Sequence, residues 1–388
     1  MYKHSVLSFF LVVSFFHFSS NAQNNGTNSN ADKQLSSRFE QFLMYPIDSV
    51  GFPRSMSKTG VIHKVPSKDW TSGFYVGNLW QIYSLTRDSR YKEYATQWIP
   101  FLEKEKYNAG THDMGFKVYC SFGNGYKITQ SEEYKKVIIQ SAQTLSTRFN
   151  KKVGSIKSWD NRAKWDFPVI IDNMMNLELL FEASKMTGDD SFKKIAIQHA
   201  NTTLKNHFRK DNSCFHVVSY DTLTGKVKSK NTHQGYSDDS SWARGQAWAV
   251  YGYTMAYRYT KDKSYLKQAE ATAQFFINHK NMPADGIPYW DFNMPDIPNT
   301  TRDASAAAIM ASALFELYGI TKNEEYLNYS NKVIQSLSSD KYVLNETVNA
   351  PFILDHSTGD WSKKAELDEP INYADYYFLE ALIRQKSL

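Results

Sequence analysis

The fold of this chain is decided by a short turn that first reads Thr86-Arg87-Asp88-Ser89-Arg90-Tyr91. The further copies read Thr187-Gly188-Asp189-Asp190-Ser191-Phe192, Thr260-Lys261-Asp262-Lys263-Ser264-Tyr265, Thr321-Lys322-Asn323-Glu324-Glu325-Tyr326 and, more weakly, Thr129-Gln130-Ser131-Glu132-Glu133-Tyr134. The Asp or Asn is suited to cap an incoming helix, and the aromatic residue three positions later can pack beneath it. Each copy therefore predicts the end of one helix and the start of the next.

Helical periodicity extends on both sides of every copy, with little convincing strand alternation outside loops. The expected outer helices are 34–46, 89–106, 131–149, 190–208, 262–279 and 323–338. The expected inner helices are 70–85, 112–128, 172–186, 241–259, 302–319 and 372–385. Six helix pairs predict an all-α fold, a closed (α/α)6 toroid formed by a single domain over residues 34–388, with an open helical solenoid as the alternative.

The first 33 residues indicate an exported protein. Residues 1–22 carry an apolar run, Val6 to Phe16, followed by Ser20-Asn21-Ala22, which is typical of a cleaved signal peptide rather than a membrane span. Residues 23–33 are expected to form a flexible lead-in.

The net charge of +5 is ordinary for 388 residues, so nothing favours nucleic acid or a membrane surface as a partner. The two cysteines, Cys120 and Cys214, are interpreted as two buried thiols rather than a disulfide.

The toroid predicts where the functional residues gather. Because short turns join each inner helix to the next outer helix, the long connections meet at the inner helices' N-terminal ends. The polar and aromatic residues expected there are Trp70, His112, Asp113, Asp172, Asn173, Trp242, Arg244, Arg302, Asp303, Asn372 and Asp375. Indole faces stack on sugar rings, and acids and amides bind hydroxyl groups, so the residue types favour a carbohydrate site.

One segment of this face, His233–Trp248, is especially rich in polar and aromatic residues. Its run Asp238–Ser241 is expected to cap the helix that follows, whose free N–H groups would suit an anionic or hydroxyl-rich ligand. A capped helix with ordinary aromatic packing is the alternative.

Two carboxyl groups are the candidate acids. Asp172 follows the apolar run Phe167–Ile171, where desolvation would raise its pKa and favour a protonated acid at neutral pH; a plain helix N-cap is an equal alternative. Asp113 has the same two interpretations, with capping slightly favoured. No spacing of histidines and cysteines resembles a zinc site, and there is no phosphate-binding loop or nucleophile elbow, so neither a metal nor another cofactor is expected.

Four motifs resemble the unsaturated glucuronyl hydrolases of glycoside hydrolase family 88. They are His112-Asp113-Met114-Gly115-Phe116, Asp172-Asn173-Met174-Met175-Asn176-Leu177, Trp242-Ala243-Arg244-Gly245-Gln246-Ala247-Trp248 and the segment 372–382, in the same order and over nearly the whole chain. The resemblance implies the (α/α)6 barrel. It also implies, as substrate, oligosaccharides from polysaccharide lyases, which carry a C4=C5 double bond in the terminal uronic acid.

The resemblance also implies roles for individual residues. Asp172 would be the general acid/base that protonates C4 and activates the water attacking C5, and Asp113 the second essential carboxylate. The implied substrate contacts are Trp70, His216, Gln234, Trp242, Arg244 and Trp248. Family members bind sulfated sugars with Ser and Lys residues of the last long loop. Ser357 and Lys364 offer these residue types here, and the alignment of this loop with the family stays open.

Three other functions stand beside this one. The related unsaturated rhamnogalacturonyl hydrolases carry Arg-Gly-Asn-Gly-Trp where this chain has Arg244-Gly245-Gln246-Ala247-Trp248, which favours the glucuronyl family. A non-catalytic periplasmic sugar-binding toroid would not need Asp113 and Asp172 together. An inverting two-carboxylate glycosidase would act on saturated sugars. Small lyase products suit a periplasmic location, which is the expected destination after export.

Overall fold

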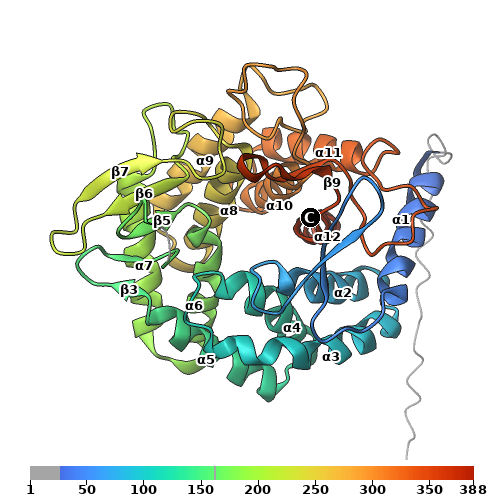
Figure 1. Cartoon of the computed structure of the whole chain (residues 1–388), viewed down its shortest axis with the longest axis horizontal. Coiled ribbons are helices and arrows are strands. Elements are labelled where there is room, and N and C mark those ends of the chain that lie inside the picture. The colour runs from blue at the N-terminus through green and yellow to red at the C-terminus, as the bar shows by residue number, and fades with distance from the viewer. Residues whose placement is uncertain (1–26, 161–162) are drawn as a thin grey trace, which may run out of the picture.

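A computed structural model describes residues 27–160 and 163–388 of the chain, and the predicted signal peptide, residues 1–22, lies outside them. Figure 1 shows the helices arranged as a ring in two layers, and the C-terminus lies by the inner helix α12. The outer helices are α1 (Thr27–Met44), α3 (Ser89–Leu102), α5 (Glu132–Ser146), α7 (Asp190–Asn206), α9 (Lys263–Ile277) and α11 (Glu324–Leu337). The inner helices are α2 (Ser72–Thr86), η2 (Gly115–Gly123) with α4 (Asn124–Thr129), α6 (Asn173–Thr187), α8 (Ala243–Thr260), α10 (Ala304–Thr321) and α12 (Asn372–Lys386).

The ring is closed by contacts between successive inner helices. α2 packs on η2, η2 on α6, α6 on α8, α8 on α10, α10 on α12, and α12 returns to α2. The predicted (α/α)6 toroid is therefore confirmed, and the open solenoid is excluded. The inner helices are buried on nearly every side, because outer helices cover one face and other inner helices the rest. This explains why α10, apolar enough by composition to cross a membrane, is mostly buried.

The recurring turn has one hydrogen-bond pattern in four of its five copies, and in the fifth the cap Ser131 accepts from the amide three positions on instead of two. In the first copy, Thr86 Oγ1 donates to the Ile82 carbonyl and accepts from the Asp88 amide, while Arg87 adopts φ of 63° and Asp88 accepts from the Arg90 amide. The capping residues of the other copies are Ser131, Asp189, Asp262 and Asn323. Each cap offsets an unpaired N–H group of the incoming helix, so the predicted capping is confirmed.

Most helix ends lie within four residues of their predicted positions, and two departures have a clear physical reason. α1 begins at Thr27, so part of the expected lead-in over residues 23–33 is helical; the good helix formers Ala31, Lys33 and Gln34 favour this. The helix expected from 112 begins only at Gly115 and is a π-helix up to Gly123. A side chain at Gly115 would lie 2.7 Å from Asn176 Cα, so glycine is required for this close approach.

The long connections contain short antiparallel strands that the sequence did not predict. They form β1 (Phe52–Met56) with β2 (Ile62–Val65), β3 (Phe149–Asn150) with β4 (Ser155–Ile156), the sheet β5 (Pro168–Ile170), β6 (Val217–Tyr220) and β7 (Val227–Asn231), and β8 (Ser357–Asp360) with β9 (Ala365–Glu369). Ile170 pairs with Val217, and the Ile171 amide donates to the His216 carbonyl. This register brings His216 beside the segment that leads into α6.

Both cysteines are buried and free, which confirms the interpretation as thiols. Cys120 lies on η2, whereas Cys214 precedes β6 and its amide donates to Gln246 Oε1 at 2.7 Å. Burial raises the pKa of the Cys214 thiol to about 12, so this group behaves as an inert packing residue.

Candidate active site

A cavity of about 230 Å³ opens at the N-terminal ends of the inner helices. Its wall consists of Arg54, Trp70, His112, Asp113, Phe116, Trp159, Ile170, Asp172, His233, Gln234, Arg244, Gly359, Asp360 and Lys363. These residues come from β1, from the segments before α2, η2 and α6, from α8 and from the loop at β8. The fold thus brings together five predicted site residues, namely Trp70, Asp113, Asp172, Gln234 and Arg244.

Asp172 occupies the N-cap position of α6 but does not cap it. Its backbone is α-helical, no helix amide donates to its carboxylate, and Oδ2 is buried without a hydrogen-bond partner in the part of the chain that the structure describes. Burial raises the pKa of Asp172 to about 7, with Asp113 acting in the same direction and Arg244 opposing it. The simple capping interpretation is therefore wrong, and the side chain is a buried carboxyl that exchanges a proton near neutral pH.

His216 presents a neutral imidazole N–H toward Asp172, just beyond hydrogen-bond distance. Its Nδ1 accepts from the backbone amides of His233 and Gln234, both at 3.1 Å, so the ring proton must lie on Nε2. Nε2 lies 3.6 Å from Asp172 Oδ2, and burial lowers the pKa of the imidazole well below its ordinary value. The backbone of the loop before α8 therefore fixes which atom His216 presents to the acid.

Asp113 also lines the cavity, from the segment before η2. Its carboxylate accepts from Thr111 Oγ1 at 2.8 Å, and Oδ1 lies 3.1 Å from His112 Nε2. Met114 is the N-cap residue of η2, and no side chain of the described residues makes a capping hydrogen bond there. Helix capping therefore does not explain the position of Asp113 either.

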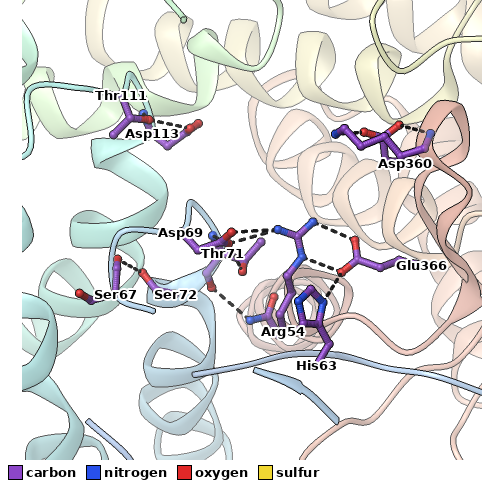
Figure 2. Close-up of polar contacts among 12 residues, drawn as sticks. Arg54, His63, Ser67, Asp69, Thr71, Ser72, Thr111, Asp113, Asp360 and Glu366 are labelled. Carbon is purple, nitrogen blue, oxygen red and sulfur yellow. Dashed lines mark hydrogen bonds and ion pairs between the residues drawn. The ribbon is translucent and has the colours of Figure 1, made fainter. Parts of the chain in front are cut away.

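Arg54 forms a rigid part of the wall that sequence reasoning missed. Its Nε and Nη2 donate to the two oxygens of Glu366 at 2.6 and 2.8 Å, and Nη1 lies 3.1 Å from Asp69 Oδ2. Figure 2 shows Arg54 between these carboxylates, with His63 beside Glu366. The guanidinium also lies 5.8 Å from the ring centre of Trp70. No local pattern marks Arg54, because its two acid partners lie in separate segments.

Arg244 holds the loop at β8 against α8. It donates to Asp303 Oδ2 at 2.5 Å and to the carbonyls of Thr358 and Gly359, both at 2.6 Å. Gln234 Nε2 donates to the same Gly359 carbonyl at 3.1 Å. The guanidinium is thus both a wall of the cavity and the anchor of one of its loops.

The other predicted contacts lie behind the cavity wall or away from it. Trp242 is buried against His216 and beneath the Arg244 guanidinium, and Trp248 is fully buried against Phe116. Ser357 is buried on β8, and Lys364 follows the turn at its end. Among the described residues, the lysine of this loop that lines the cavity is Lys363 and not the predicted Lys364.

The expected cap of α8 is also corrected. Trp242 occupies the N-cap position without a side-chain bond, and the Ala243 amide donates to the Trp290 carbonyl. Asp238 instead accepts from the Thr232 amide, and Ser240 donates to the buried Asp291. The run Asp238–Ser241 therefore shapes the loop that carries Gln234.

Further residues expected on this face serve the scaffold. Asp303 caps α10, Asn372 donates to the carbonyls of Pro53 and Thr71, and Asp375 accepts from the Leu354 amide. Within residues 27–160 and 163–388, no group of three His, Cys, Asp or Glu side chains is placed to hold a metal ion.

Comparisons with known proteins agree with this geometry. The model of the Glycosyl Hydrolase Family 88 matches residues 52–278. An unsaturated glucuronyl hydrolase of Formosa agariphila is 60% identical over 372 residues, which are 94% of this chain and 93% of that protein. The crystal structure of an unsaturated glucuronyl hydrolase specific for heparin has a TM-score of 0.89 and 45% identity, covering 92% of this chain and 96% of that one.

A third relative has been solved with a saccharide. It is a variant of the unsaturated glucuronyl hydrolase of Streptococcus agalactiae complexed with dGlcA-GalNAc6S, with a TM-score of 0.78 and 28% identity over 95% of this chain and 94% of that one. The match of the family model and the identity to the Formosa agariphila protein together show that this chain belongs to Glycosyl Hydrolase Family 88.

Proposed function

We propose that this enzyme hydrates the C4=C5 enol ether of an unsaturated glucuronyl residue at the end of an oligosaccharide. The observation that carries the proposal is Asp172: a buried carboxyl on the cavity wall, free of any capping bond, with a pKa near 7. A group with this pKa is available as an acid and, after losing its proton, as a base at neutral pH.

The reaction needs one acid/base and one water. Asp172 gives its proton to C4, where a C–H bond forms as the double bond is consumed, and the ring oxygen stabilises the positive charge left at C5. Water then adds to C5 and returns a proton to Asp172. The resulting hemiketal opens by breaking the bond between C5 and the ring oxygen, which leaves a ketone at C5 and a hemiacetal at C1. Collapse of that hemiacetal releases the shortened saccharide, so no covalent glycosyl-enzyme is needed.

The neighbours of Asp172 suit this cycle. The neutral Nε2–H of His216 faces Oδ2 at 3.6 Å and stabilises the carboxylate that exists after C4 is protonated. Arg244 supplies the positive charge nearest to the acid and complements the substrate carboxylate, with Gln234 beside it. Trp70 offers an indole for stacking at the cavity wall.

Asp172 also argues against the alternative functions. A sugar-binding protein has no need for a buried carboxyl with a pKa near neutrality, because ionising that group costs stability without adding affinity. An ordinary inverting glycosidase would need a saturated sugar and a second carboxyl acting as base on a water.

We further propose that the substrates are lyase-generated oligosaccharides of a uronic-acid polymer such as a glycosaminoglycan or ulvan. The heparin-specific relative and the complex with dGlcA-GalNAc6S support this class. The apolar run and small-x-small motif within residues 1–22 support export, and we propose the periplasm as the site of action.

Isotope incorporation distinguishes hydration from ordinary hydrolysis. When the reaction is run in D₂O, protonation of C4 by Asp172 places deuterium on one face of C4 in the released uronate, which NMR of the early product detects. Ordinary hydrolysis would release the unsaturated uronate, whose spontaneous tautomerisation takes up deuterium on both faces of C4, so that outcome would refute the proposed chemistry.

A further inference from the structure

Arg54 lines the cavity and has hydrogen-bond donors to spare. A guanidinium carries five N–H groups and no acceptor. Arg54 Nε and Nη2 donate to the two oxygens of Glu366 at 2.6 and 2.8 Å, and Nη1 donates to Asp69 at 3.1 Å. Each nitrogen thus uses one N–H, so Nη1 and Nη2 each keep an N–H that has no partner among the described residues.

The free N–H groups face the cavity. Arg54, Asp113 and Asp360 line the same cavity of about 230 Å³. In Figure 2 the edge of the guanidinium between Nη1 and Nη2 is turned toward the side on which Asp113 and Asp360 lie. The Arg54 side chain is 17% exposed and that of its partner Glu366 only 6%. Because two nitrogens pair with Glu366, the plane of the guanidinium is fixed and its free edge is a rigid pair of donors.

This arginine has no surplus positive charge. Burial acts to raise the pKa of Glu366, but the neighbouring His63 and Arg54 hold it below its ordinary value, so this carboxyl is ionised at neutral pH. Asp69 is a second carboxylate on the same guanidinium. His63 lies 3.8 Å from Glu366, and even a protonated His63 would only bring the four groups to zero net charge. An anionic substrate group at this edge would therefore meet two carboxylates whose charge is not outweighed.

Arg244, elsewhere on the cavity wall, is arranged differently. Its hydrogen bonds go to one carboxylate, that of Asp303, and to the carbonyl oxygens of Thr358 and Gly359. Burial raises the pKa of Asp172 while the charge of Arg244 lowers it, so this charge is felt inside the cavity. Arg244 is therefore suited to the substrate carboxylate, and Arg54 to uncharged oxygen atoms.

Arg54 also fixes the indole on which a sugar would stack. The guanidinium lies 5.8 Å from the ring centre of Trp70. Asp69 accepts from the Thr71 amide and hydroxyl at 2.9 and 2.6 Å, so it holds the backbone on both sides of Trp70. A sugar ring stacked on an indole presents its hydroxyl groups at its edge, within reach of a guanidinium beside the indole.

We propose that Arg54 is a specificity-determining residue whose free N–H groups bind hydroxyl oxygens of the unsaturated sugar stacked on Trp70, while Asp69 and Glu366 keep sulfate groups away from them. A hydroxyl group can accept from Arg54 and donate to Asp69, which is 22% exposed, whereas a sulfate ester has no proton to donate. The inference rests on the proposed function for the identity of the sugar, but the dissociation constants that test it do not depend on the chemistry of Asp172.

Binding to protein that carries Asp172→Asn tests this role without turnover. Isothermal titration calorimetry compares two unsaturated disaccharides that differ only in a sulfate ester on the unsaturated sugar. The sulfate-free disaccharide should bind at least about tenfold more tightly. Arg54→Lys, which keeps the charge but loses the planar fork, should weaken binding of the sulfate-free disaccharide by about tenfold. Glu366→Gln removes one carboxylate charge, so the preference for the sulfate-free disaccharide should fall by about fivefold.

Lys58→Gln is the matched control. Lys58 pairs with Asp368 at 2.9 Å and so joins the turn between β1 and β2 to β9 at an exposed position; its replacement should change neither dissociation constant. Equal weakening by Arg54→Lys and Glu366→Gln, with an unchanged preference between the two disaccharides, would make Arg54 a scaffold cross-link only and overturn the proposal. Equally tight binding of the two disaccharides to Asp172→Asn protein would overturn it as well. The hydration chemistry is tested separately, by deuterium incorporation at C4.

Discussion

Replacing Asp172 with Asn is expected to stabilise the folded protein at neutral and alkaline pH. Burial raises the pKa of this carboxyl from 3.8 to about 7 in the folded state. In the unfolded chain it ionises near pH 4, so between about pH 4 and 7 only the folded state holds the proton. The contribution of Asp172 to the free energy of unfolding therefore falls as pH rises through this range, by about 1.4 kcal/mol per pH unit. The cost reaches about 4 kcal/mol above pH 7.

The neutral amide of Asn avoids this cost. Urea unfolding, followed by tryptophan fluorescence at intervals between pH 4 and 8.5, measures the difference in the free energy of unfolding between variant and wild type. That difference should grow in favour of the variant up to about pH 7 and then level off. Asp189→Asn is the matched control, because its carboxyl is exposed and caps α7. A difference for Asp172→Asn that does not change with pH would refute the raised pKa.

Three further changes test the scaffold. Arg244→Met should lower the free energy of unfolding by about 3–5 kcal/mol in urea, since it leaves buried Asp303 without its cationic partner; a loss below 1 kcal/mol would contradict this role. Gly73→Ala should lower the free energy of unfolding by about 1–3 kcal/mol or more, because the added Cβ would lie 2.3 Å from the Lys117 carbonyl oxygen. It should also reduce activity, because Lys117 follows the cavity residue Phe116; an unchanged melting temperature would argue against that contact. Asp189→Ala should lower the free energy of unfolding in urea through the lost cap and leave kcat/KM unchanged, and a change in kcat/KM would show that the turns influence the site.

The toroid could be predicted because its signals are local. Each turn copy contains its own threonine, left-handed residue and cap within six residues. The residues that end one helix and start the next are therefore adjacent in the sequence, and a local pattern reveals them. The position of the site followed from topology alone, since short turns on one face place the long connections on the other. The π-helix could not be predicted, because its wide turn depends on Gly115 packing against Asn176 from another helix.

The site was predicted where a residue lies next to a helix start, as Asp113 and Asp172 do. Arg54 was missed because its partner Glu366 is 312 positions away, and a pairing of that kind leaves no local pattern. The sequence left the register of the last loop open, because Lys363 and Lys364 are adjacent lysines at the end of a short turn between β8 and β9 and no local pattern decides which of them faces the cavity. Trp248 lies on an inner helix that is buried all round, where an aromatic residue packs in the core as readily as it lines a site.

The central claim is that Asp172 protonates a C4=C5 double bond. The direct measurement follows the ultraviolet absorbance of the conjugated double bond in unsaturated disaccharides from several polymers, using protein from Gln23 onward near pH 6. The account predicts that absorbance falls with wild type and with Asp189→Asn but not with Asp172→Asn, and the fastest substrate would identify the polymer. Absorbance that stays constant with wild type while the disaccharide still binds, or that falls equally fast with Asp172→Asn, would contradict the account.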